Sequence, residues 1–177
     1  SQKGMNIRLF DNINISNIVA YGDKYKHKKL LLSDSSEYKL KQISKEQKLR
    51  DKLIKNNLEP CRSVLFVGPP GVGKTMSAHW LAHELGLPLL IMDIASIMSS
   101  KLGETGNNIK RLRDTASSSP CVLLLDEFDS IAKTRDDESD VGELKRIVTV
   151  LLQAMDSWPS TSLLIAATNH PEILDKA

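Results

Sequence analysis

The sequence lacks both a membrane-spanning segment and the pattern of a secretory leader. Its apolar runs stay well below the roughly 18 residues that a transmembrane helix needs, and no signal-peptide pattern is visible at its start. Only two of the 177 residues are cysteines, Cys61 and Cys121, too few for the disulfide framework of a small secreted domain. We therefore expect a protein of the reducing cytoplasm.

A strong charge imbalance is also missing. The chain has 24 basic and 22 acidic residues, a formal net charge of +2. Dedicated nucleic-acid binders more often show a clustered basic excess, so the charge argues neither for nor against nucleic acid. Hydrophobic residues make up 41% and charged residues 26% of the chain, as in ordinary globular proteins. The length is sufficient for one domain with a hydrophobic core.

Residues 68–75 fit the pattern G-x-x-x-x-G-K-[ST] of a phosphate-binding loop. Glycines let successive backbone N–H groups point at an anion, and the following helix adds its N-terminal N–H groups and dipole. An apolar strand at 64–67 and a helix at 74–85 are expected on either side, a context that favours a phosphate loop over a surface turn. The predicted nucleotide-binding residues are Gly68, Pro69, Pro70, Gly71, Val72, Gly73, Lys74, Thr75 and Met76.

The remaining pattern divides the chain into an N-terminal linker or extension (1–33) and one domain (34–177). Asp34 and Glu37 are spaced as in a capping box, which predicts a helix from Asp34 to about Asn57. Near-continuous apolar runs that alternate with helical patterns predict a parallel sheet covered on both faces. Ligands of such sheets bind beyond the carboxyl ends of the strands. Strands are expected at 64–67, 88–94, 122–125 and 162–168, and further helices at 107–118 and 142–156.

Polar side chains follow two of these strands. Asp126 and Glu127 come directly after strand 122–125, where Asp126 could hold magnesium and Glu127 could polarise an attacking water. Asn169 ends strand 162–168, where its amide could bond the γ-phosphate or that water. Taken alone, each could instead be an ordinary solvated strand end or turn. With the loop present, Lys74 is expected to reach the β- and γ-phosphates, and Thr75 to ligate magnesium.

Three segments in order, 68–75 (GPPGVGKT), 123–131 (LLLDEFDSI) and 165–171 (IAATNHP), closely resemble the AAA+ ATPases. The resemblance covers roughly residues 58–177. It implies a P-loop NTPase three-layer α/β/α sandwich with a five-stranded parallel sheet of order 5-1-4-3-2, binding of ATP with Mg²⁺, and assembly into a ring, usually a hexamer. It also implies that Asp126 and Glu127 form the second nucleotide motif, that Asn169 is the first sensor, and that Lys74, Glu127 and Asn169 are catalytic.

The sequence departs from the family pattern in two places. The loop Lys101-Leu102-Gly103 occupies the position of the pore loop that grips polypeptide, but Lys101 stands where an aromatic residue is usual. The arginine fingers and the helical lid of the family follow the position of Ala177, and neither Arg135 nor Arg146 matches a finger. An arginine finger can contribute a factor of roughly 10³–10⁵ in rate. We therefore expect residues 1–177 alone to be largely monomeric and to bind nucleotide more readily than they hydrolyse it.

Three functions remain open at this stage. The first is an ATPase module that remodels or unfolds a protein substrate within a ring. The second is a nucleotide-dependent assembly or DNA-associated switch, which the missing pore aromatic favours slightly. The third, a small-molecule kinase, is disfavoured by the acidic pair and Asn169. Stimulation of turnover by protein or by DNA would distinguish the first two.

Overall fold

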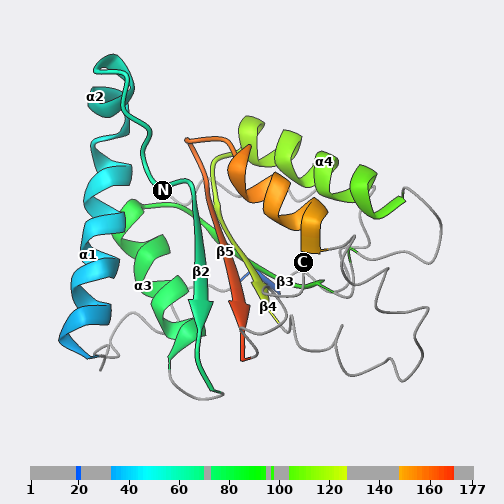
Figure 1. Ribbon diagram of the computed structural model, residues 1–177, viewed down its shortest axis with the longest axis horizontal. Helices are drawn as coiled ribbons and strands as arrows, with labels where there is room; N and C mark the ends of the chain where they lie inside the picture. Colours follow the sequence, from blue (N-terminus) through cyan, green and yellow to red (C-terminus); the bar gives the residue numbers. More distant parts are fainter. Residues whose placement is uncertain are drawn as a thin grey trace.

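The computed structural model describes residues 19–20, 33–69, 73–94, 97, 104–126 and 148–169. A helix also covers the described residues 148–156. In this part of the chain, no helix has the length and apolar character needed to cross a bilayer. The elements in chain order (Figure 1) are β1 (Val19–Ala20), α1 (Asp34–Lys48), α2 (Arg50–Lys55), β2 (Ser63–Val67), α3 (Lys74–Leu85), β3 (Leu89–Asp93), α4 (Glu104–Ser118), β4 (Val122–Asp126) and β5 (Leu163–Thr168).

The sheet has the order β1-β3-β4-β5-β2. The four strands from β3 to β2 are parallel, and their order agrees with the expected 1-4-3-2 arrangement of the first four strands. An additional strand outside the expected order, β1, lies at the opposite edge of the sheet and pairs antiparallel with β3. Within the described ranges no strand pairs with the outer edge of β2. The short N-terminal strand was not predicted, since two residues carry no readable periodicity.

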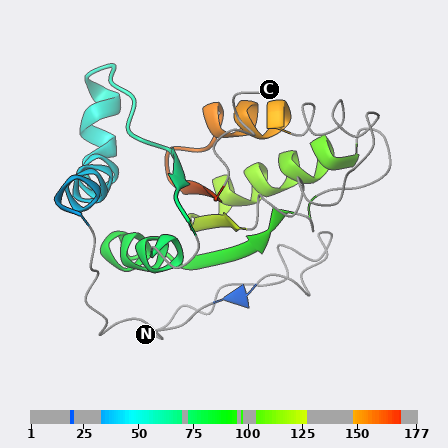
Figure 2. The ribbon, with the colours of Figure 1, turned by 60° about the horizontal axis from the view of Figure 1, so that its bottom comes forward.

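Strands β3, β4 and β5 are largely buried because helices cover both faces of the sheet. All six residues of β5 are buried, and alternate side chains point to opposite faces. Leu163, Ile165 and Ala167 join α1 and α3 in one core cluster. Leu164 and Ala166 join α4 and the helix at 148–156 in the other. Figure 2 shows the two helical layers on either side of the sheet, which confirms the predicted three-layer α/β/α class.

The first helix differs from the prediction at both ends. Ser33, not Asp34, is the N-cap, and its hydroxyl accepts a hydrogen bond from the backbone N–H of Ser36 at 3.4 Å. Asp34 is already helical, where its charge favours the positive end of the helix dipole. The single helix expected to reach Asn57 is interrupted at Leu49, whose ψ of 9° separates α1 from α2. The helix predicted at 107–118 starts earlier, at Glu104.

Candidate functional site

The turn into α3 depends on glycine. Gly73 caps the helix with φ 92° and ψ 19°, in the left-handed region that strains other residues. Its carbonyl accepts two hydrogen bonds from Ser77, from the backbone N–H at 2.8 Å and from Oγ at 2.9 Å. These bonds fix the start of the helix, whose first-turn N–H groups have no partners within the helix. An anion placed there would meet both those donors and the positive end of the dipole.

Lys74, the first residue of α3, links the loop to the end of β5, the strand next to β2. Its ammonium Nζ donates to the carbonyl of Gly68, to the carbonyl of Pro69 at 3.1 Å and to Oδ1 of Asn169. An ammonium has three donors, so all three are used. Charge-assisted bonds of this kind are stronger than neutral ones. The half-buried Lys74 is therefore held at the carboxyl ends of β2 and β5.

Three polar side chains share the α3 side of this sheet edge. Asp93 and Asp126 are partners in register at the ends of β3 and β4. Asp93 and Asp126 follow Ile91 and Leu124 by two residues. Ile91 and Leu124 both pack in the core cluster that includes residues of α1 and α3. Because side chains alternate along a strand, Asp93 and Asp126 point to that same face. Asn169, two residues after Ala167, continues the alternation of β5 toward it as well.

This arrangement fits a magnesium–nucleotide complex. The Lys74 ammonium and the start of α3 provide positive charge and N–H donors for phosphates. The carboxylate of Asp126 and the hydroxyl of Thr75 are hard oxygen donors, which magnesium prefers. Phosphates and magnesium would thus contact separate groups at one edge of the sheet. A nucleotide that carries a divalent ion requires both kinds of group.

The structure brings some of the predicted residues together and leaves others untested. Gly68, Pro69, Lys74 and Asn169 are in direct contact. Thr75 and Met76 are half-buried in the first turn of α3, and Asp126 is half-buried at the end of β4. The predicted residues outside the described part are Pro70, Gly71, Val72, Glu127 and the loop Lys101-Leu102-Gly103. Arg135 and Arg146, which match no finger position, also lie outside it.

Two features of the site were missed from the sequence. In the sequence, Asp93 lies within the apolar run 88–94, whereas in the structure it ends β3 as Asp126 ends β4. The available signal was that each of two neighbouring parallel strands ends in an aspartate, which indicates a pair of carboxylates at one edge of the sheet. The contact between Lys74 and Asn169 joins residues 95 positions apart. Both residues were predicted to face the phosphates, but no local pattern indicates that they bond each other.

Comparison with known proteins agrees with this geometry. Residues 64–177 match the model of the ATPase family associated with various cellular activities (AAA). An uncharacterised AAA family ATPase of Sinorhizobium fredii, y4kL, is 42% identical over 148 residues, 84% of this chain and 45% of that protein. A putative 26S proteasome regulatory subunit homolog of Methanothermobacter thermautotrophicus is 40% identical over 121 residues, 66% of this chain and 32% of that protein.

The structural comparison concerns the fold alone. The crystal structure of the FIGL-1 AAA domain in complex with ADP superposes with a TM-score of 0.65 at 24% identity, over 99% of this chain and 59% of that one. The chain spans less than half the length of the two curated relatives. The family resemblance predicted from the three motifs is confirmed, because the family model matches more than half of the sequence. The chain belongs to the AAA family of ATPases.

Proposed function

We propose that this chain binds ATP with magnesium at the carboxyl edge of its sheet and hydrolyses it. The observation that carries the proposal is the placement of the Lys74 ammonium between Gly68, Pro69 and Asn169. This placement puts a positive charge at the mouth of the loop, on the same face as Asp126. Family membership supports the same activity.

Each residue has a distinct role in this proposal. Lys74 neutralises charge on the β- and γ-phosphates, and Thr75 and Asp126 hold the magnesium ion. Magnesium, when bound, adds further positive charge at the transferring phosphoryl group. Glu127, which directly follows Asp126 in the sequence, accepts a proton from the attacking water. The amide of Asn169 accepts from Lys74 through Oδ1, and an amide NH₂ group can donate to phosphate or water.

At the level of the whole protein, we propose that the module acts in a ring, as a hexamer, to remodel or unfold a protein substrate. One relative is named as a proteasome regulatory subunit homolog, which supports a polypeptide substrate. The loop Lys101-Leu102-Gly103 is the proposed contact with that substrate. Since Lys101 replaces an aromatic residue, the grip relies on Leu102 and on the stem and charge of the lysine.

Binding and hydrolysis can be tested separately. Calorimetric titration of the 177-residue chain with ATP and magnesium tests binding, and phosphate release from the full-length protein tests turnover. Glu127→Gln should bind ATP as the parent does and lose turnover, because the amide is isosteric but cannot act as a base. A chain that binds no nucleotide would refute the proposed site, and an undiminished rate in Glu127→Gln would remove that residue from the chemistry.

A further inference from the structure

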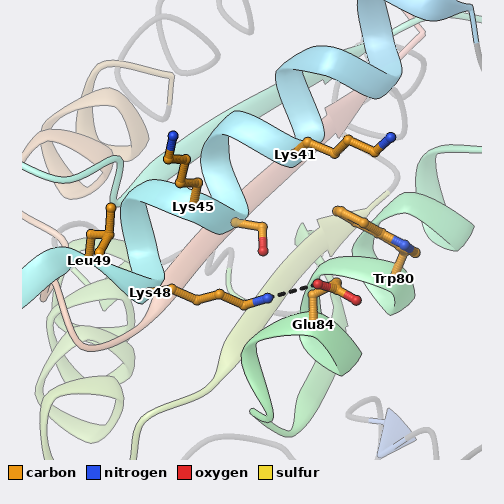
Figure 3. Close-up of a pocket in the computed structure, with 7 residues that line it drawn as sticks. Lys41, Lys45, Lys48, Leu49, Trp80 and Glu84 are labelled. Carbon is orange, nitrogen blue, oxygen red and sulfur yellow. Dashed lines mark hydrogen bonds and ion pairs between the residues drawn. The ribbon is translucent and has the colours of Figure 1, made fainter.

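A groove of about 620 Å³ lies between α1 and α3, outside the nucleotide site. Figure 3 shows Lys48 of α1 directed at Glu84 of α3, with Trp80 on the same side as Glu84, while Lys45 and Leu49 extend from α1 away from α3. Trp80 and Glu84 lie about 9 and 15 Å along α3 from Lys74, at about 1.5 Å of rise per residue. A ligand in the groove would therefore leave the phosphate loop free. The residues that line it are Lys41, Ser44, Lys45, Lys48, Leu49, Trp80 and Glu84.

The groove is basic. Lys41, Lys45 and Lys48 are spaced four and three residues apart, so they share one face of α1. Lys41 pairs with Glu37 at 2.7 Å, and Lys48 pairs across the groove with Glu84 at 2.8 Å. Such exposed pairs contribute little stability and can exchange partners. Lys45 is exposed, and within the described ranges no ion pair involves it. The lining carries three ammonium groups against one carboxylate.

The groove also has apolar surface. Leu49 is 42% exposed at the end of α1. Trp80 is half-buried, because one side of it contacts the core cluster beneath α3 while the rest lines the groove. Ser44 is only 4% exposed and forms part of the floor. An indole beside lysine stems can accept an apolar side chain from a partner while the ammonium groups stay in water.

We propose that this groove is a docking site for an acidic protein segment that carries a bulky apolar side chain. Carboxylates of such a segment complement Lys41, Lys45 and Lys48, and its apolar side chain covers Trp80. Glu84 favours a peptide over nucleic acid, because a peptide backbone offers N–H donors to that carboxylate and a phosphodiester backbone offers only acceptors. The groove volume is also within the range of ordinary ligand sites, about 300–1,000 Å³.

The test uses the 177-residue chain and a fluorescein-labelled, glutamate-rich peptide with leucines spaced along it. Binding is followed by fluorescence anisotropy, with the same peptide carrying lysines for glutamates as the charge control. Lys45→Glu should weaken binding about fivefold, which corresponds to the upper value of about 1 kcal/mol for an exposed charge pair. Lys39→Glu is the matched control, because Lys39 is exposed on α1 but does not line the groove, and it should bind like the parent.

Tryptophan fluorescence gives a second readout. The only other tryptophan, Trp158, is 1% exposed, so an unlabelled peptide in the groove should shift the emission of Trp80. Equal weakening by Lys45→Glu and Lys39→Glu, or no emission shift, would overturn the proposal. The proposal would also be overturned if a single-stranded oligothymidylate bound more tightly than the acidic peptide and Lys45→Glu abolished that binding. That result would assign the groove to nucleic acid. Self-association of the chain that Lys45→Glu abolishes would assign it to a second copy and overturn the proposal equally.

Discussion

Replacing Lys74 with alanine tests the nucleotide site most directly. The substitution removes the one ammonium that joins the loop carbonyls to Asn169. Hydrogen bonds to charged groups contribute about 1.5–3 kcal/mol each. Because this ammonium already bonds to three oxygens, phosphate binding exchanges partners rather than adding new bonds. We therefore expect a net loss of about 2–3 kcal/mol of binding free energy, or about 30–150-fold weaker ATP binding.

The assay is calorimetric titration of Lys74→Ala with ATP and magnesium. Lys110→Ala is the matched control, because Lys110 is an exposed lysine on α4, on the opposite face of the sheet from α3. It removes the same charge away from the site and should keep parental affinity. The Lys74 variant should stay folded, since water can solvate the half-buried acceptors that it leaves. A folded Lys74→Ala that binds ATP within about threefold of the Lys110→Ala affinity would refute the assignment of the loop.

Three further outcomes follow from single groups. Asp126→Asn should lose the gain in ATP affinity that magnesium provides, because a neutral amide is a poorer magnesium ligand than a carboxylate. Titrations with ATP in the presence and absence of magnesium measure this gain. A gain as large as that of the parent would contradict the role of Asp126. Ser162→Ala should lower the free energy of unfolding in urea by about 2–4 kcal/mol. The fully buried Ser162 donates to the carbonyl of Ala116 at 2.7 Å and accepts from the N–H of Cys121 at 3.0 Å, and the substitution removes both bonds. Ser117→Ala, at an exposed serine of α4, is the control and should change the free energy of unfolding by less than about 0.5 kcal/mol. Burial raises the pKa of Cys121 to about 11 from 9.0, so the folded state holds this proton longer than the unfolded state. The contribution of the protonated Cys121 to the free energy of unfolding is fully present below pH 9 and is lost as the pH rises to about 11. The free energy of unfolding should therefore fall less steeply across that range in Cys121→Ala than in the parent. Equal slopes would contradict the raised pKa of Cys121.

The strands were predictable because their signal is local. Val122–Asp126 and Leu163–Thr168 are apolar over nearly their whole length, and a parallel strand covered on both faces needs no other pattern. Helix ends were less predictable, since Ser33 and Asp34 both have side chains that can cap a helix. Which of them caps depends on where the chain turns into the helix. The interruption at Leu49 has no glycine or proline to indicate it.

The sequence by itself predicted a phosphate loop, and it determined the alternation of strands and helices and the family. These features depend on residue types at fixed local spacing, which the chain carries in any conformation. Only the tertiary structure decided that Lys74 bonds Asn169, that Asp93 lies beside Asp126, and that lysines of α1 face Trp80 and Glu84 of α3. Those relations depend on strand order, on register and on the packing of helices distant in sequence. Each of these is set by burying apolar surface across the whole domain, and no local pattern records it.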